Sequence, residues 1–270
     1  MQIADSNKIN VHKTAIVEAG AQLSPGVTIG AYAYVGPFVR LGRNTVVDHH
    51  ATVDGHTEIG EDNRIYPYAF IGAKTHDLKY KNGQTFLRIG HRNVFREYTS
   101  VHTATGDGDR TVVGDDNYFL AFAHLGHDCC VGHHVVVSAG AAIGGHVHLD
   151  DYVNVGGNAS IHQFCHLGTY AMLGAHSFLK KDLLPFFLAI GVPATVQSFN
   201  QVGMKRCGFS ALEQREVKHL FKCFYQGPHN RSQALEKIRS LASLPETSDS
   251  MRKRISTFDE FCGRSVRGLI

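Results

Sequence analysis

The chain has 270 residues, of which 43% are hydrophobic, so it can bury a core and form one or two domains. Lys and Arg number 27 against 24 Asp and Glu, and a net charge of +3 gives no reason to expect nucleic acid or a membrane surface as a partner. No apolar run approaches the ~20 residues of a membrane span, and residues 1–6 (MQIADS) lack the basic and apolar segments of a signal peptide.

A large apolar residue recurs at every sixth position in three runs, from residue 11 to 71, from 89 to 101 and from 113 to 179. A period of six fits neither an α-helix nor an ordinary strand. It is typical of a parallel β-helix, in which three hexapeptides make one triangular coil. We therefore predict a left-handed parallel β-helix domain over residues 1–196, with repeats that begin near residue 9. Each repeated residue should point inward, and the glycine after it, as in Ile29-Gly30, should fit a tight corner of unusual φ.

Two polar segments interrupt the six-residue repeat, at residues 73–88 and 103–111. A solenoid accommodates insertions as loops on one face, which is often the binding face. The first loop contains Asp77 and Lys79, and these residues favour a functional role for it. The second loop is equally compatible with a functional and an inert role.

Helical spacing replaces the repeat in residues 197–270, which we predict to be a small C-terminal helical domain. Ser210 and Glu213 form a capping-box pattern, and Gly227-Pro228 should end the helix that follows. Ser232 can cap a second helix. The expected inward faces of three helices are Val217, Leu220, Phe221 and Phe224, then Leu235, Ile238 and Leu241, then Met251, Ile255, Phe258 and Phe261. This domain should cover the open end of the solenoid.

Histidines gather where the coil register brings them together. One coil is about eighteen residues, so Asp128, His146 and Phe164 should stack, with His127 and His162 beside them. A histidine next to an aspartate suits general base catalysis, because imidazole titrates near neutral pH and a carboxylate can orient it. A single histidine in this fold is more often structural, as we expect for residues 49–50 and 133–134. The four clustered histidines favour a functional role; they are His124, His127, His146 and His162.

Zinc is the competing interpretation of these histidines. The γ-class carbonic anhydrases are trimeric β-helix enzymes whose zinc site includes a His-x4-His pair, but none of the 18 histidines here has another five positions later. We therefore expect no metal and no other cofactor. The six cysteines contain no CxxC pair, which predicts reduced thiols and a cytoplasmic location.

Five segments together carry a family resemblance over essentially the whole chain. They are residues 77–80 (DLKY), 123–129 (AHLGHDC), 161–165 (IHQFC), 203–209 (GMKRCGF) and 264–270 (RSVRGLI). With these segments the chain resembles the acyl-carrier-protein-dependent UDP-N-acetylglucosamine O-acyltransferases of lipid A biosynthesis. The hexapeptides alone indicate only the fold, which enzymes and non-catalytic subunits share.

The resemblance implies a role for each matching residue. His127 would be the general base, Asp128 would orient it, and the Gly145 N–H would stabilise the oxyanion. The substrate-binding positions would be Asp77, His124, His146, His162 and Gln163 for the sugar, Lys79, Asn200 and Arg206 for the nucleotide or the carrier-linked donor, and Ala175 for the end of the acyl tail.

The chain also departs from the family pattern. Val202 and Cys207 stand where better-known members have a Glu and an Arg, so the details of nucleotide binding stay open. Ala175 replaces a Gly and Pro193 replaces a His, so the acyl length stays open.

The expected partners are an acyl carrier protein bearing a 3-hydroxyacyl chain, a UDP-sugar and two further copies in a homotrimer. We expect the trimer because flat prism faces can pack around a threefold axis, and because the loops of the site lie too far apart along the chain to meet within one subunit. The alternative is a non-catalytic β-helix scaffold subunit, which would need neither the His127-Asp128 pair nor the Asp77 loop.

Overall fold

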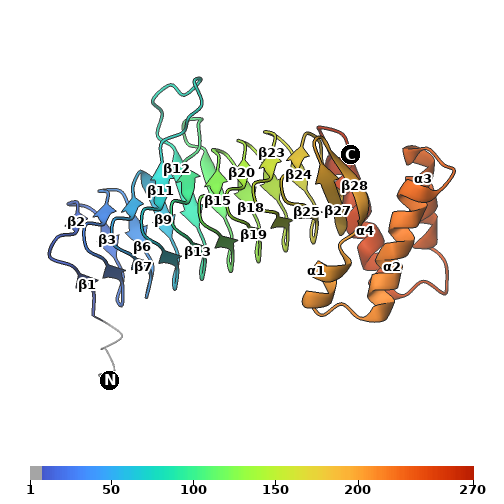
Figure 1. The fold of residues 1–270 in the computed structure, drawn as a ribbon, viewed down its shortest axis with the longest axis horizontal. Helices are drawn as coiled ribbons and strands as arrows, with labels where there is room; N and C mark the ends of the chain where they lie inside the picture. Colours follow the sequence, from blue (N-terminus) through green and yellow to red (C-terminus); the bar gives the residue numbers. More distant parts are fainter. Residues whose placement is uncertain (1–7) are drawn as a thin grey trace.

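The computed structural model describes residues 8–270; the N-terminal residues 1–6, considered above for a signal peptide, lie outside the described range. Its main body is a long prism of stacked coils, with a loop projecting near β11 and β12 and helices at the C-terminal end (Figure 1). Three sheets form the sides of the prism, and successive coils pair in parallel with aligned register, for example Val136 with Asn154 and Val137 with Val155. This arrangement is a parallel β-helix.

The strands divide among three sheets, which the chain visits in turn. The first sheet contains β1 (Asn10–Val11), β4 (Thr28–Ile29), β7 (Val46–Val47), β10 (Arg64–Ile65), β13 (Val94–Phe95), β16 (Tyr118–Phe119), β19 (Val136–Val137), β22 (Asn154–Val155), β25 (Met172–Leu173), β27 (Phe187–Gly191) and β28 (Ala194–Phe199). The second contains β2 (Ile16–Val17), β5 (Tyr34–Val35), β8 (Thr52–Val53), β11 (Phe70–Ala73), β14 (Ser100–His102), β17 (His124–Leu125), β20 (Ala142–Ile143), β23 (Ser160–Ile161) and β26 (Phe178–Leu179). The third contains β3 (Gln22–Leu23), β6 (Arg40–Leu41), β9 (His56–Ile59), β12 (Phe86–Ile89), β15 (Arg110–Val113), β18 (Cys130–Val131), β21 (His148–Leu149) and β24 (His166–Leu167).

The repeated apolar residues fill the prism, as predicted. From Ile29 onward they are buried almost completely, and Phe95 and Phe119 stack inside with ring centroids 5.1 Å apart. The first coil differs, since Val11 is 47% exposed and Val17 and Leu23 are only half-buried. No residue of the described range lies beyond that coil to cover them.

The expected role of the corner glycines was wrong. The positive φ falls three residues after the inward residue, at Tyr32 and His50 for example, and these residues are not glycine. Gly30 matters for a different reason, because a Cβ there would lie 2.5 Å from the backbone nitrogen of His49 on the next coil. These glycines permit close approach of neighbouring coils instead of supplying an unusual dihedral angle.

The two loops are shorter than the sequence interruption suggested. Because β11 runs to Ala73 and β12 starts at Phe86, the first loop spans residues 74–85, and the second spans 103–109. The loops are hydrogen-bonded to each other, with the Gln84 N–H donating to the Asp107 carboxylate over 2.7 Å.

The C-terminal part contains α1 (Gln201–Arg206), α2 (Ala211–Phe221) with the π-helical turn η1 (Lys222–Gln226), α3 (Arg231–Leu241) and α4 (Asp249–Arg264). The Ser210 capping box is confirmed. The predicted Ser232 cap was wrong, because Asn230 accepts from the Gln233 N–H and begins α3 two residues earlier. Helix α1 and the β27–β28 hairpin were not predicted, and the proposed boundary at residue 196 falls within β28.

The helices pack against the last strands of the solenoid. Phe187 of β27 contacts the rings of Phe221, Tyr225 and Phe258, with centroids 5.6 to 5.9 Å apart. The chain end returns to the solenoid as well, because Leu269 bridges to Asp182. Among residues 8–270, no helix combines the length and apolar character needed to cross a membrane.

Candidate active site

The predicted histidine cluster lies on one corner of the prism, between the second and third sheets. Asp128, His146 and Phe164 occupy this corner on successive coils, all with positive φ, and we call it the histidine edge. The His146 N–H donates to the carbonyl of His127 over 2.9 Å, and the rings of His146 and Phe164 stack 4.5 Å apart. The eighteen-residue register therefore brings these side chains together as the sequence predicted.

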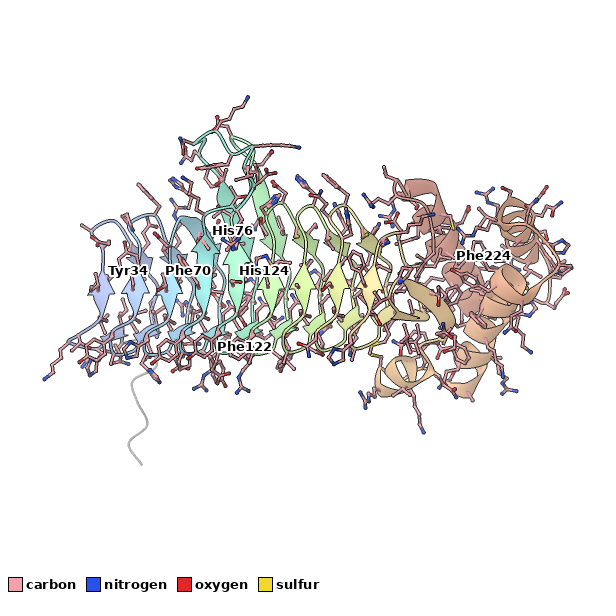
Figure 2. The ribbon with its side chains drawn as sticks, turned by 45° about the horizontal axis from the view of Figure 1, so that its top comes forward. Tyr34, Phe70, His76, Phe122, His124 and Phe224 are labelled. Carbon is pink, nitrogen blue, oxygen red and sulfur yellow. The ribbon has the colours of Figure 1, made fainter. Side chains whose placement is uncertain are left out.

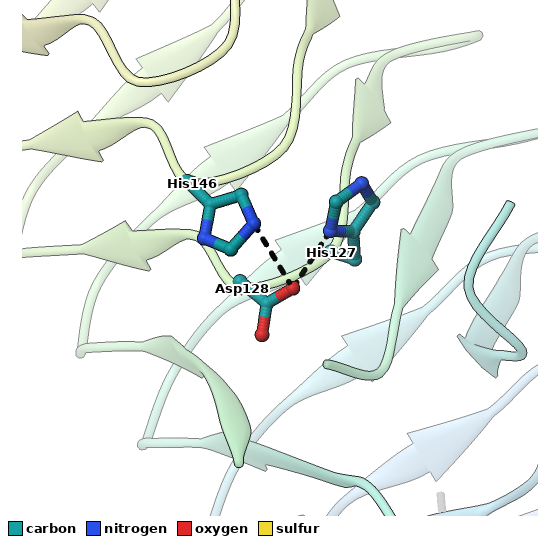
Figure 3. Close-up of side chains that lie close together, drawn as sticks. All are labelled: His127, Asp128 and His146. Atoms are coloured by element: carbon teal, nitrogen blue, oxygen red, sulfur yellow. Dashed lines mark hydrogen bonds and ion pairs between the residues drawn. The ribbon is translucent and has the colours of Figure 1, made fainter. Parts of the chain in front are cut away.

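His127 and Asp128 form a close pair at this edge (Figure 3). The His127 Nδ1 lies 2.7 Å from the Asp128 Oδ2, and the two side chains are only 13% and 9% exposed. The Nε2 of His146 approaches the same oxygen at 3.6 Å. Since the carboxylate engages Nδ1, it fixes the tautomer that leaves the Nε2 of His127 free to accept a proton.

Two neighbouring residues hold Asp128 in place. The backbone N–H of Thr105 donates to the Asp128 Oδ1 over 3.2 Å, and the Asp128 N–H donates to the Thr111 hydroxyl over 2.8 Å. With one carboxylate oxygen bound to Thr105 and the other to His127, the carboxylate cannot rotate freely. The Thr105 contact leaves no signal in the sequence, because its donor is a backbone N–H.

Gly145 packs directly against the base. It is buried, and a Cβ built on it would lie 2.5 Å from the His127 Nε2. Its backbone N–H makes no hydrogen bond to any residue in the described range 8–270. A free amide donor beside the unoccupied nitrogen of a base is the arrangement that stabilises an oxyanion formed there.

A second histidine group adjoins this pair on the outer face of the second sheet. His76, from the loop, lies near His124 (Figure 2), and their parallel rings have centroids 6.2 Å apart. The ring of His102 stands perpendicular to both. The Ser100 hydroxyl lies 2.8 Å from the His124 Nδ1, which directs the Nε2 to any ligand. Burial lowers the pKa of His124, with His76 and His127 adding to the shift, so His124 acts as a neutral hydrogen-bonding group.

His102 should make the protein sensitive to acid. Burial, reinforced by His124, His76 and His127, lowers the pKa of His102 to about 3, against 6.5 for a free histidine. Below pH 6.5 the unfolded chain binds a proton at this histidine that the folded chain excludes. The free energy of unfolding therefore decreases as the pH is lowered, and His102 accounts for a loss of about 2 kcal/mol at pH 5. The buried Nδ1 has no hydrogen-bond partner in the described chain. Between pH 7.5 and pH 5, the free energy of unfolding of His102→Phe, measured with urea, should therefore decrease by about 2 kcal/mol less than that of the parent. An equal decrease in both proteins would contradict this assignment.

The chain matches two family models and is similar to curated acyltransferases. A family model described as UDP N-acetylglucosamine O-acyltransferase, domain 2, matches residues 182–270, and the bacterial transferase hexapeptide model matches residues 110–145. Curated acyl-[acyl-carrier-protein]–UDP-N-acetylglucosamine O-acyltransferases are similar at 41% identity in Burkholderia lata, over 96% of this chain and 98% of the relative, and at 38% in Thermodesulfovibrio yellowstonii, over 87% and 92%.

Solved structures give the same result for the fold. The Francisella novicida UDP-N-acetylglucosamine acyltransferase superposes with a TM-score of 0.90 at 31% identity, covering 96% of this chain and 93% of that one. The Acinetobacter baumannii LpxA structure gives a TM-score of 0.88 at 35% identity, with 96% and 99% covered. The chain belongs to the acyl-[acyl-carrier-protein]–UDP-N-acetylglucosamine O-acyltransferase family. The family resemblance and the left-handed parallel β-helix predicted from the sequence are confirmed, and the chain is an enzyme of this acyltransferase family.

Both loops approach the proposed site within one chain, since the ring centroids of His76 and His124 lie 6.2 Å apart and the Thr105 N–H donates to Asp128. His76 contacts His102, and the next residue, Asp77, accepts a hydrogen bond from the Lys79 N–H over 2.8 Å. The expectation that these loops are too distant to meet in one subunit was wrong. The parallel stacking of coils brings residues 76 and 124 close together, although they are far apart along the sequence.

His162 and Gln163 extend the edge by one coil. The His162 Nδ1 lies 3.0 Å from its neighbour's carbonyl, and Gln163 is exposed next to Gly144, where a Cβ would be 2.8 Å from the Gln163 nitrogen. Both residues are therefore available to a ligand that lies along the coils from His127.

Three other residues that match the family pattern lie away from the histidine edge. Asn200 is buried at the start of α1, where its side chain accepts from the Gly203 N–H and donates to the Tyr170 carbonyl. Arg206 is exposed at the end of α1, and Ala175 is exposed after β25, between the first and second sheets. One chain does not bring Asn200, Arg206 or Ala175 to the histidine edge. Val202 and Cys207 are also exposed at α1, and the structure gives no reason for these two substitutions.

His127, Asp128 and His146 could in principle bind a metal, since their ligand atoms lie within 4.8 Å of one another. The spacing between the His127 Nδ1 and the Asp128 Oδ2 is 2.7 Å, a hydrogen-bond distance. Ligands at ~2.0–2.2 Å around a tetrahedral ion would be roughly 3.3 Å apart. The geometry as it stands fits a base and its orienting carboxylate better than a metal site.

Proposed function

We propose that this chain transfers a 3-hydroxyacyl group from acyl carrier protein to the glucosamine 3-position of UDP-N-acetylglucosamine, or of its 3-amino analogue, as the first step of lipid A biosynthesis. One observation carries the proposal: the His127–Asp128 pair, 2.7 Å apart, lies beside the free N–H of Gly145 in a chain of this family. A scaffold subunit would need no such arrangement.

His127 is the general base of the proposed reaction. Its Nε2 accepts the proton of the sugar 3-hydroxyl while that oxygen attacks the carbonyl carbon of the thioester. Asp128 stabilises the imidazolium that forms, and the Gly145 N–H donates to the oxygen that becomes negative. The intermediate then collapses, the C–S bond breaks, and the carrier thiolate takes the proton from His127. The products are the sugar ester, or the amide with a 3-amino acceptor, and the free carrier thiol.

The acceptor is held by the polar groups that surround this pair. Asp77, His124, His146, His162 and Gln163 bind the sugar, while Lys79, Asn200 and Arg206 contact the nucleotide or the carrier-linked donor. The neutral state of His124 supports this assignment, since it can bind a hydroxyl without a charge. All six cysteines are free thiols, which supports the expected cytoplasmic location alongside a carrier-linked donor.

The direct test is an acyl-transfer assay with purified 3-hydroxyacyl carrier protein of several chain lengths. UDP-N-acetylglucosamine and its 3-amino analogue are compared as acceptors, because one pocket could serve either nucleophile. Absence of transfer with every donor, together with no UDP-sugar binding, would favour the non-catalytic scaffold.

We expect a homotrimer in solution. Asn200, Arg206 and Ala175 lie away from the histidine edge of their own chain, so a neighbouring copy would have to supply them to a complete site. Light scattering should give three times the chain mass of 29.6 kDa. A stable monomer with full activity would contradict a shared site.

The acyl tail should run along the outside of the β-helix between subunits and end near Ala175. Each buried methylene contributes about 0.8 kcal/mol, which limits discrimination per carbon to a few-fold, so a bulky side chain should act through steric exclusion. Ala175→Met should shift donor preference toward chains several carbons shorter, with little change in UDP-sugar affinity. A donor-length profile identical to that of the parent would mean that the tail ends elsewhere, for example beside the exposed Pro193.

A further inference from the structure

The two loops that interrupt the coils are joined by a pair of threonines. The hydroxyl of Thr75, in loop 74–85, lies 2.9 Å from the hydroxyl of Thr105, in loop 103–109. Thr75 is buried and Thr105 is half-buried, so the contact lies beneath the loop surface, where water competes little. A hydrogen bond between these hydroxyls fixes the distance between the two loops at Thr75 and Thr105.

Each threonine also holds a residue of the proposed site. The Asp77 N–H donates to the Thr75 hydroxyl over 3.1 Å, and the Thr105 N–H donates to the Asp128 Oδ1 over 3.2 Å. Asp128 in turn engages His127. A continuous series of hydrogen bonds therefore runs from the acceptor-binding loop through both threonines to the base.

We propose that Thr75 and Thr105 are positioning residues that couple the Asp77 loop to the His127–Asp128 pair. The inference rests on the proposed function of that pair. Binding of an acceptor to Asp77 steadies Thr75, and the hydroxyl contact transmits this restraint through Thr105 to the carboxylate that orients the base. Neither threonine touches the reacting atoms.

The alternative is that the contact only packs the two loops together, and the chain offers a control for it. Asp107 accepts from the Gln84 N–H over 2.7 Å, so it also joins the loops, but it is exposed and has no hydrogen bond to Thr75, Thr105 or Asp128. Asp107→Ala should remove one link between the loops, while the threonine pair keeps loop 103–109 in place and the series of hydrogen bonds stays intact. If the loops need only to be packed together, it should act like the threonine variants.

The test compares Thr75→Val, Thr105→Val and the double variant with Thr75→Ser, Thr105→Ser and Asp107→Ala. Valine keeps the shape and removes the hydroxyl, while serine keeps the hydroxyl. Each Val variant should lower kcat/KM for UDP-N-acetylglucosamine about tenfold, the scale of one buried hydrogen bond, with both kcat and KM affected. The double variant should be no worse than either single one. The Ser and Asp107 variants should stay within about threefold of the parent.

A second measurement does not depend on activity. Amide hydrogen exchange followed by mass spectrometry should show faster exchange in both loops for Thr75→Val, and parent-like exchange at residues 103–109 for Asp107→Ala. The coupling would be overturned by any of three results. The effects of the two Val substitutions could add, the Val variants could keep the activity of the parent, or the Asp107 variant could lose as much activity as the Val variants. An inactive parent would count against the proposed function, while the exchange result would still decide the coupling.

Discussion

His127→Ala is expected to lower turnover by about a hundredfold or more, the usual scale for loss of a positioned general base. The reason is geometric. Asp128 holds the Nδ1 of His127 at 2.7 Å, so the Nε2 is the nitrogen that can accept the hydroxyl proton, and alanine offers no substitute. The measurement is single-turnover acyl transfer from a 3-hydroxyacyl carrier protein, with UDP-sugar affinity determined separately.

The variant should still fold, because His127 is not one of the inward residues that fill the prism. His134→Ala is a suitable control, since this exposed histidine occupies a corner with positive φ and stacks on Tyr152, away from the histidine edge. It should retain near-parent turnover. A His127 variant within about fivefold of the parent would refute its assignment as the base.

The sequence was most informative where coils have constant length. Eighteen residues separate Asp128 from His146 and His146 from Phe164, so position alone predicted their stacking. The strict apolar repeat fixes this register, because a shift by one residue would turn every inward side chain outward.

Prediction failed where an insertion changes the coil length. Ser100 pairs with His124 across twenty-four residues, because the second loop lengthens that coil, and a fixed spacing of eighteen could not find it. The loops of the site were likewise not expected to meet within one subunit, although the hydroxyls of Thr75 and Thr105 lie 2.9 Å apart. A solenoid keeps its core register across an insertion, so the strand after the loop returns to its place in the sheet whatever the length of the loop.

Other features of the site left no signal in residue types. The Thr105 contact to Asp128 uses a backbone N–H, which every residue except proline possesses. The family resemblance assigns Gly145, but its packing against the His127 ring depends on the stacking of two coils and leaves no mark in the sequence. Residue types thus indicate the side chains that perform the chemistry more readily than the contacts that hold these side chains in place.

Gly145→Ala is expected to lower kcat by about a hundredfold with a smaller change in acceptor KM. The three atoms nearest to an added Cβ all belong to the His127 imidazole, and the Nε2 would be only 2.5 Å away. The ring must therefore move, which displaces the base from Asp128 and from the oxyanion donor together. Misplacement of a catalytic group by about 1 Å can cost a factor of this size.

Displacement of the His127 ring can be distinguished from a general disturbance of the backbone by making Gly145→Ala in a variant that lacks the imidazole. In a His127→Ala background the added methyl group meets no ring, so Gly145→Ala should reduce the residual activity less than about threefold, although it costs a hundredfold in the parent. Gly263→Ala is the matched control, because a Cβ at that position in α4 would have no atom within 4 Å apart from the backbone of its own helix. If Gly145→Ala were equally harmful in both backgrounds, its effect would come from the backbone, and the proposed contact with the base would not be the reason for the glycine.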